Sequence, residues 1–522
     1  MRGKSALVFA VGLSLVAVPV AAQAGADDQK GKTTLEQTIK KKGSGYTKVV
    51  KGKGEKYVVR SDIKKPGSKR TKNRKSLAFF GQLTDPQVAD EMSPARTELV
   101  DPAAGAISAA WRPQEALGVR VFDSVIQNMN ANKTSRVAAG DGSRAKLQFS
   151  LLTGDVADSQ QYNEVRWFRQ VLEGKKVNPH SGKKISASNP CSSATSAEID
   201  QMNAEVAAKK YVGVQDFSLW PGQDKRYAGF WDPNIGGSDD EYGYGSFPKF
   251  PGLMDKAQTK MKAKGLDLPW YITRGNHDTL VQGNVPANLS VAGLPIGGIA
   301  TGCLKPWPNN LLNPNLLIGL PSGDVFDRLT QPDMLPGILF GLTQMRKVSP
   351  DPDRRYVSKV EFKENVGKGD NQRGFGYVSK SQLKSSRGNA SYYAFNRGPF
   401  RIIMLDTNAE GGGAEGNLDN PQYKWLQKQL DKYSNVEIRN GKIKRDSGKN
   451  KMLIISSHHT IATMTNPTPD EAAGICDDPL EPGCDSDPRN SEPIHLGDKG
   501  KKSVLDLLLR YPNVVGYVNG HT

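Results

Sequence analysis

The stretch from Lys146 to Asp158 constrains the fold more than any other part of the sequence. Its apolar run, Leu147 to Leu152, has the length and the flanking residues of a buried β-strand. Gly154 follows, and because glycine has no side chain the backbone can turn sharply there. Asp155 is therefore expected at the carboxyl end of a strand, the edge of an α/β sheet at which ligands bind. A single Gly-Asp pair is most often a simple turn, so the interpretation depends on whether the plan recurs.

The same plan recurs five more times along the chain. In each case an apolar, strand-like run leads into a polar residue that could bind a metal ion. These segments are Leu77 to Gln87, Leu268 to Asp278, Phe400 to Asn408, Met452 to His459 and Val514 to His521. The sequence therefore predicts six strands with polar, metal-competent tips.

Apolar residues at helical spacing predict four helices in the same region. Leu117, Val121, Val125 and Met129 fall on one face of the first, and the others are expected over 160–172, 423–433 and 504–508. The alternation of strands and helices indicates an α/β fold. Two regions, about 173–264 and 279–390, fit neither strand nor helix well. Such long loops are generally functional or disordered, and both could shape a substrate pocket.

The strand tips form an ordered set of motifs. They read Thr84-Asp85-Pro86-Gln87, Gly154-Asp155-Val156-Ala157-Asp158, Gly275-Asn276-His277-Asp278, Ser457-His458-His459 and Gly520-His521. This order resembles that of the calcineurin-like metallophosphoesterases, in particular the secreted bacterial type, from about Leu77 to the end of the sequence. Three of the five family motifs match, the first is altered, and the last is cut short at Thr522. The resemblance implies a four-layer α/β/β/α sandwich with long loop insertions.

The resemblance also implies two divalent metal ions and assigns their ligands, with Asp155 as the bridge between them. The other ligands are Asp85 and Gln87 for one ion, and Asn276, His458 and His521 for the other. Oxygen and nitrogen ligands without thiolate suit Mn, Fe or Zn. Two ions held about 3.5–4 Å apart stabilise both the attacking and the leaving oxygen of a phosphoryl displacement.

His277 is not assigned to a metal ion by the family pattern. It resembles the residue that contacts the phosphate and protonates the leaving oxygen, with Asp278 available to orient it. The alternative is that His277 is only a hydrogen-bonded loop residue. His459 is expected to lie behind the ligands, although the choice between it and the preceding imidazole is open. Asp158 and Asp406 are expected to brace loops.

Two departures from the family pattern affect the same metal position. Residue 87 is Gln where the pattern has His, and an amide oxygen is a poorer ligand than imidazole for these ions. The second His of the last motif would follow Thr522. One tightly bound ion and a weak second site are therefore expected. The leading hypothesis is a secreted phosphoesterase that hydrolyses mono- or diesters with a metal-activated water. The alternative is a catalytically impaired member that acts as a binding protein.

The first 24 residues have the pattern of a secretory signal. Arg2 and Lys4 precede an apolar run from Ala6 to Val20, and Ala22-Gln23-Ala24 follows it. A membrane anchor is the alternative interpretation. Export to the outside of the cytoplasm is therefore expected.

Residues 25–75 form a basic segment. Between Asp27 and Lys75, 17 Lys and Arg stand against five Asp and Glu, which accounts for +12 of the formal net charge of +17. With so few apolar residues the segment cannot bury enough surface to offset its ordering entropy, so a mostly extended arm is expected. The high pI describes this arm and not a groove. Specific nucleic-acid binding is therefore not expected, while contact with an anionic cell surface is compatible with the charge.

Residues 76–522 show no interdomain linker and are expected to form one metallophosphoesterase domain. Phosphate esters are its expected substrates, and a monomer is its expected state. Its four cysteines would be exported to an oxidising environment. Cys476 and Cys484 are close enough in sequence to close a small ring, which would leave Cys191 and Cys303 for a bridge between the two insertions. Four cysteines allow three pairings. The sequence contains no Cys-x-x-Cys zinc motif.

Overall fold

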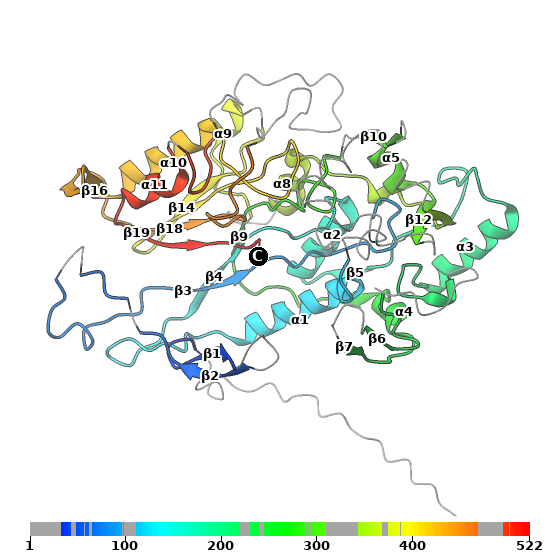
Figure 1. Cartoon of the computed structure of the whole chain (residues 1–522), viewed down its shortest axis with the longest axis horizontal. Coiled ribbons are helices and arrows are strands. Elements are labelled where there is room, and N and C mark those ends of the chain that lie inside the picture. The colour runs from blue at the N-terminus through cyan, green and yellow to red at the C-terminus, as the bar shows by residue number, and fades with distance from the viewer. Residues whose placement is uncertain are drawn as a thin grey trace, which may run out of the picture. The chain divides into compact units, whose positions relative to one another are not determined.

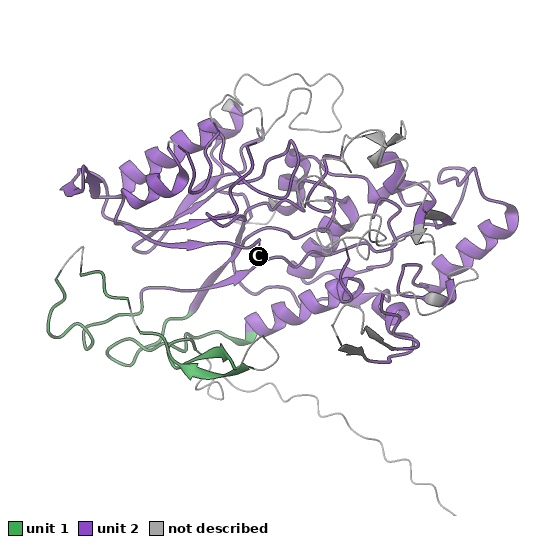
Figure 2. Ribbon diagram, viewed as in Figure 1, with its two compact units in different colours: residues 1–76, 131–146 green, residues 77–130, 147–522 purple. Residues whose placement is uncertain are grey.

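The computed structural model describes residues 33–42, 49–56, 58–61, 65–96, 98, 111–219, 230–239, 245–287, 290–291, 294–308, 343–367, 374–386, 388–467, 494–500 and 502–521. The chain divides into two compact units, residues 1–76 with 131–146 and residues 77–130 with 147–522 (Figure 2). Helices and strands are mixed in the larger unit, so the predicted α/β class is confirmed.

The smaller unit contains an antiparallel ribbon of two strands, β1 (Gln37–Lys41) and β2 (Val49–Lys53). Directly paired residues of an antiparallel ribbon lie on the same face. Ile39 pairs with Lys51, and Lys41 pairs with Val49, two positions further along the same face. Ile39 and Val49 are 74% and 58% exposed. One face of the ribbon therefore presents aliphatic side chains among lysines.

The first sheet of the larger unit is parallel and has the strand order β3-β4-β9. Its strands are β3 (Phe79–Leu83), β4 (Leu147–Leu152) and β9 (Trp270–Ile272). Two helices, α1 (Gly118–Ala131) and α2 (Tyr162–Leu172), contribute their buried side chains to the same hydrophobic cluster as these strands. The helices therefore cover this sheet.

The second sheet has the order β14-β15-β18-β19. Its strands are β14 (Tyr393–Arg397), β15 (Phe400–Met404), β18 (Met452–Ser456) and β19 (Val514–Val518), of which only β14 is antiparallel to its neighbour. Helices α10 (Asn420–Tyr433) and α11 (Val504–Leu509) share a hydrophobic cluster with one face of the sheet. Figure 1 shows both helices on the same side of β18 and β19.

The two sheets share one core. Side chains alternate between the two faces of a strand, and in β15 Ile402 belongs to the cluster of the first sheet whereas Ile403 belongs to the cluster beneath α10 and α11. Phe395 of β14 lies with its ring centroid 4.1 Å from that of Tyr271 in β9 and 6.2 Å from that of Phe149 in β4. The inner faces of the sheets are therefore joined by aromatic contacts.

All six predicted strands and all four predicted helices of this unit are present. The stripe at positions 117, 121, 125 and 129 that predicts α1 is, however, not the face that the helix buries. Its buried apolar side chains are Val119, Phe122 and Ile126, whereas Val121 and Val125 are 50% and 41% exposed. The helix has two apolar stripes, and the one that includes the large Phe122 faces the core.

Short elements also occur in the insertions and the remaining loops. The helices are α3 (Ser196–Ala208), α4 (Leu253–Ala257), α5 (Ile296–Thr301), α8 (Lys359–Gly367) and α9 (Lys380–Ser385), with 3-10 turns at Glu115–Leu117, Phe217–Leu219 and Pro352–Arg354. The strand pairs are β5 (Lys176–Val177) with β8 (Met261–Lys262), β6 (Gly237–Asp239) with β7 (Gly245–Phe247), β10 (Ser290–Val291) with β11 (Leu294–Pro295), β12 (Leu304–Pro308) with β13 (Thr343–Lys347), and β16 (Val436–Arg439) with β17 (Lys442–Arg445).

The expectation that residues 173–264 and 279–390 fit neither helix nor strand is wrong, because both regions contain the short helices and strand pairs given above, and α3 is the longest of these helices. The side chain of Thr195 accepts a hydrogen bond from the backbone N–H of Glu198 and caps this helix. Met202 is the residue of α3 that is buried. Because the helix buries so little, it carries no apolar stripe by which the sequence could reveal it.

A disulfide joins Cys191 to Cys303, with their Cα atoms 5.9 Å apart. It links the two insertions, as predicted for this pair of cysteines. Cys476 and Cys484, and the predicted signal over residues 1–24, lie outside the described residues. Within the part of the chain that the structure describes, no helix has both the length and the apolar character needed to span a membrane.

Candidate metal centre

The loops after the parallel strands of both sheets meet at one place. The backbone N–H of Gln87, after β3, donates to the carbonyl oxygen of Asp155, after β4, over 2.9 Å. In the second sheet the N–H of Gly520, after β19, donates to the carbonyl oxygen of His458, after β18, over 2.9 Å. These bonds hold neighbouring strand tips together, so side chains that are distant in sequence project into a common space.

Side-chain atoms of Asn276, His521 and Asp155 lie around Nε2 of His458. His458 Nε2 is 2.9 Å from Asn276 Oδ1, 3.2 Å from His521 Nδ1 and 3.3 Å from Asp155 Oδ2, and His521 Nδ1 is 3.0 Å from Asn276 Oδ1. Ligands bound at about 2.1 Å to one ion stand about 3.0 Å apart at a right angle and about 3.4 Å apart at the tetrahedral angle. These four separations are in the range of neighbouring ligands of one divalent ion.

The lone pairs of this set point inward. His458 Nδ1 lies 2.7 Å from the carbonyl oxygen of Thr153, which assigns its proton there and leaves Nε2 as an acceptor. The amide nitrogen of Asn276 donates to the carbonyl oxygen of Gly283 over 3.0 Å, so Oδ1 is the atom directed at His458. Acceptors that converge in this way are stabilised by a cation. The residues present therefore fit the metal ion that the family resemblance implies.

The pKa values of the two imidazoles shift in opposite directions, and an ion that binds at Nε2 of His458 must displace a proton there. Burial by itself would lower the pKa of His458, but the carboxylate of Asp155 outweighs burial and raises it to about 9. Burial and then the charge of His458 lower the pKa of His521 to about 4. The same carboxylate that would attract a metal ion thus attracts a proton to His458, while His521 keeps a free lone pair at neutral pH.

Backbone strain is concentrated at the expected ligands. Nine non-glycine residues in the described part of the chain have a positive φ. Four of them are expected ligands: Asp85 at 51°, Gln87 at 37°, Asp155 at 52° and His521 at 58°. Left-handed backbone is unfavourable for residues with a Cβ atom and is found preferentially at functional sites. The backbone at the strand tips is therefore strained, and this strained conformation sets the direction of these side chains.

The glycines of the motifs have a steric explanation. Gly154 has a φ of 91°, and a Cβ atom placed there would lie 2.6 Å from the backbone nitrogen of Gly275. A Cβ atom at Gly275 would overlap the carboxylate of Asp155. Glycine at both positions allows the tips of β4 and β9 to approach closely enough for Asp155 to lie beside Asn276.

The second expected metal position is less complete. Asp85, Asp155 and His458 offer ligand atoms that all lie within 4.8 Å of one another. Burial and then the charge of Asp155 raise the pKa of Asp85. Gln87, however, directs its amide nitrogen at Asp155 Oδ2, 3.3 Å away, and so acts as a donor and not as a ligand. The amide oxygen would reach this space only after the amide had rotated.

His277 is next to the centre, but Asp278 does not orient it. The backbone N–H of His277 donates to Asp155 Oδ1 over 2.9 Å, and its Nδ1 lies 2.7 Å from the carbonyl oxygen of Asp158 and 3.7 Å from Oδ1 of the same residue. The carboxylate of Asp278 instead accepts backbone N–H groups from Val156, Ala157 and Gly275. The expected role of Asp278 is therefore corrected: a buried carboxylate needs donors, and the neighbouring loop supplies them.

His459 lies behind the centre, as the sequence analysis favoured. Its Nδ1 is 2.7 Å from the hydroxyl of Thr407, and its Nε2 is 2.9 Å from the carbonyl oxygen of Ala414. Both ring nitrogens of His459 therefore have partners outside the centre, although one ligand atom each of His458, His459 and His521 lie within 4.8 Å of one another and could also hold an ion. Asp406 accepts hydrogen bonds from Ser391 and Asn408 and braces the loop after β15.

Comparisons of the chain with protein-family models, curated proteins and solved structures return no match. The interpretation of this centre therefore rests on its residues and their geometry.

A buried polar network that was not predicted from the sequence lies behind the centre. Arg96 is 1% exposed and forms ion pairs with Asp158 and, over 2.6 Å, with Glu115. Glu164 accepts the backbone N–H groups of Asp90 and Ser159, each over 2.9 Å, and ties the loop after β3 to the loop after β4. The residues next to Arg96 in the sequence give no indication that it is buried. Glu164 could have been recognised, because Gln161 and Glu164 have the spacing of a capping box at the start of α2.

Proposed function

We propose that the protein is a metal-dependent phosphoesterase of the calcineurin-like type that acts outside the cytoplasm. The observation that supports this most is the convergence of acceptor atoms from Asp155, Asn276, His458 and His521 at separations of 2.9–3.3 Å. We also propose that the larger unit is a four-layer sandwich, with α1 and α2 outside one sheet and α10 and α11 outside the other. The Cys191–Cys303 disulfide supports export, since such bonds persist in oxidising environments.

The residues that would hold the first ion are Asp155, Asn276, His458 and His521. Asp85 and Asp155 would hold a second, with Gln87 as a poor third ligand. When bound, divalent ions polarise phosphoryl oxygens and generate a nucleophile from water at neutral pH. The chain itself would position the ester beside Asp155 and exclude competing orientations through the crowded strand tips.

His277 is the candidate proton donor. Its Nδ1 is anchored by the carbonyl oxygen of Asp158, and its backbone N–H is fixed on Asp155. The protonated imidazole could then donate from Nε2 to a departing alkoxide oxygen. A Cβ atom at Gly283 would lie 2.6 Å from that Nε2, so any larger residue at this position would collide with the imidazole.

Metal reconstitution tests the proposal. The full chain, stripped of metal and then supplied with Mn, Fe or Zn, should hydrolyse 4-nitrophenyl phosphate or bis(4-nitrophenyl) phosphate in an ion-dependent manner. Asp155→Asn and His458→Ala should each abolish both turnover and ion binding. Asp446→Asn is a matched control, because Asp446 is exposed and paired with Arg439 on the β16–β17 ribbon. A chain that neither binds an ion nor hydrolyses either ester would overturn the proposal.

One observation favours a second candidate function. Gln87 presents an N–H donor to Asp155 where a second ion would need a lone pair. A chain that holds a single ion and binds phosphate esters without turnover would act as a binding protein. Equilibrium binding of these esters with one ion per chain, in the absence of any hydrolysis, would select this alternative.

A further inference from the structure

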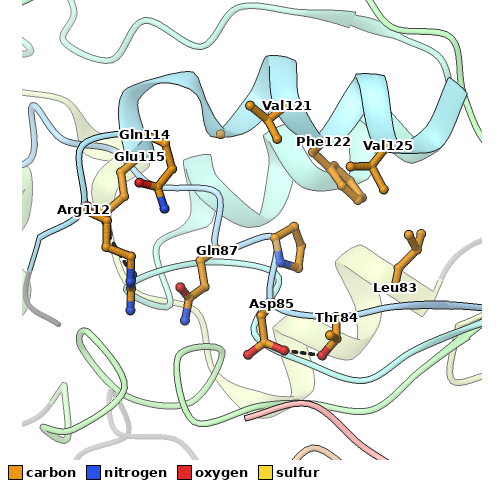
Figure 3. Close-up of a pocket in the computed structure, with 12 residues that line it drawn as sticks. Leu83, Thr84, Asp85, Gln87, Arg112, Gln114, Glu115, Val121, Phe122 and Val125 are labelled. Atoms are coloured by element: carbon orange, nitrogen blue, oxygen red, sulfur yellow. Dashed lines mark hydrogen bonds and ion pairs between the residues drawn. The ribbon is translucent and has the colours of Figure 1, made fainter. Parts of the chain in front are cut away.

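A cavity of about 260 Å³ opens beside the candidate metal centre, between the loop after β3 and helix α1 (Figure 3). Its lining divides into a polar end and an apolar wall. Asp85, Gln87 and Arg112 belong to the polar end, and Val121, Phe122 and Val125 of α1 belong to the apolar wall. Asp85 and Gln87 are also expected ligands of the second metal position, so the cavity borders that position.

Val121 and Val125, the exposed part of the apolar wall, belong to the stripe of α1 that the core leaves uncovered. Val121 and Val125 are four residues apart and therefore share one face of the helix. They are 50% and 41% exposed, whereas Phe122 between them is 3% exposed and packs against Phe168 of α2. Leu83 at the end of β3 closes the wall from the opposite side of the cavity. The exposed valines are thus not isolated surface residues but one side of a defined hollow.

The size and the position of the cavity identify the kind of group that fits. Whole ligands of drug size occupy sites of roughly 300–1,000 Å³, so a cavity of about 260 Å³ suits one part of a larger molecule. Arg112 is held at the polar end by Glu115, 2.8 Å from its carboxylate, and 28% of its side chain is exposed. A group that enters from the metal centre therefore passes polar residues first and meets hydrocarbon beyond them.

We propose that this cavity binds an apolar organic group, alkyl or aryl, of a phosphate ester whose phosphoryl group lies at the metal centre. The proposal rests on the phosphoesterase function and deepens it by naming the substrate class. The chain would prefer esters with a short hydrocarbon group over esters of small, fully polar alcohols. Specificity would then arise from α1, in addition to the two long insertions.

A homologous series of substrates tests this preference. The substrates are methyl, propyl and pentyl 4-nitrophenyl phosphate diesters, which share one leaving group and differ only in the alkyl chain. With the Mn-loaded full chain, kcat/KM should rise by about fourfold for each methylene group buried and level off when the cavity is full. Equilibrium binding of methyl-, propyl- and pentylphosphonate, followed by calorimetry, should show the same dependence without any turnover.

Two variants connect the dependence to the apolar wall. Val121→Asp and Val125→Asp place a carboxylate in the cavity, and because both valines are about half exposed the fold should survive, which circular dichroism checks. Each should flatten the dependence on chain length in both measurements. Leu509→Asp is the matched control, since Leu509 is a 64% exposed aliphatic residue on α11, and it should retain the full dependence.

The outcomes separate this inference from the function on which it rests. Ester hydrolysis without dependence on chain length would overturn the inference and leave the phosphoesterase function standing. Phosphonate binding that depends on chain length and on Val121, without hydrolysis, would support the cavity and overturn the enzymatic function. A dependence that survives both valine variants would place the apolar group elsewhere and overturn the inference.

Discussion

His458 Nε2 lies 3.3 Å from Asp155 Oδ2, although the two residues follow strands of different sheets. Asp155 follows β4 of the first sheet and His458 follows β18 of the second, so this contact exists only when the inner faces of both sheets are packed together. Ion binding at this contact should therefore be coupled to the stability of the whole larger unit.

We expect Mn or Zn to raise the melting temperature of the full chain. A ligand that binds only the folded state stabilises it by about 2.7 kcal/mol at one hundred times its Kd. Asn276→Ala and His458→Ala should lose most of the ion-dependent shift, measured by scanning calorimetry with and without the ion, whereas Asp446→Asn should keep it. An equal shift in all variants would mean that the ion binds elsewhere.

The two ion positions should be unequal. The first has four converging ligand atoms, while at the second Gln87 directs a donor at Asp155. After dialysis against trace metal, elemental analysis should find about one ion per chain. Gln87→His supplies an imidazole lone pair and should raise the second occupancy and the turnover together. Two tightly bound ions in the unchanged chain would show that Gln87 is an adequate ligand after its amide rotates.

Removal of the His277 side chain should affect turnover and not metal content. A positioned general acid contributes roughly 10²–10⁴-fold, so His277→Ala should lower kcat within that range for alkyl esters. The loss should be smaller for 4-nitrophenyl esters, because a good leaving group needs little protonation. Elemental analysis of the variant serves as the control, and loss of the bound ion would reassign His277 to the metal.

Glu164 should make stability fall as the pH rises. Burial and then the negative charge of Asp158 raise its pKa from the ordinary value of 4.5 to about 8. The charged groups that face it are Asp158 and Asp90, and Tyr356 is also close enough to interact electrostatically. Because the folded-state pKa lies above the unfolded one, the stabilisation is complete below pH 4.5 and is lost as the pH rises through about 8.

Glu164→Gln should remove this contribution. We expect the free energy of unfolding in urea to fall less between pH 5 and pH 8 in the variant than in the unchanged chain. Glu173→Gln, at the partly exposed end of the same helix, is the matched control. Identical pH dependence in Glu164→Gln and the unchanged chain would contradict the raised pKa.

The β1–β2 ribbon should bind anionic membranes. Lysines near an anionic surface contribute about 1 kcal/mol each, and Ile39 and Val49 on the same face can insert among the lipid head groups. Lys51→Gln and Ile39→Glu should both weaken binding to phosphatidylglycerol vesicles, and neither variant should bind phosphatidylcholine. Ile443→Glu, a 49% exposed residue on the β16–β17 ribbon, is the control. Dependence on Lys51 alone would indicate a polyanion such as nucleic acid.

Sequence alone determined the strands and their tips. A short apolar run followed by a polar residue, with Gly before that residue at positions 154, 275 and 520, is a local pattern. The six strand segments and the helices over 118–131 and 420–433 were therefore predictable from neighbouring residues. So was the identity of the polar residue that each tip presents.

Only the tertiary structure decided what those residues touch. Asp278 faces backbone N–H groups, and Asp158 takes the contact with His277, because loop packing sets the direction of each side chain. On α1 the apolar stripe that contains Phe122 packs into the core, and Val121 on the other stripe is exposed. Periodicity alone does not distinguish the two stripes. Burial and contact depend on segments hundreds of residues apart, and a local pattern contains no information about which of them will pack together.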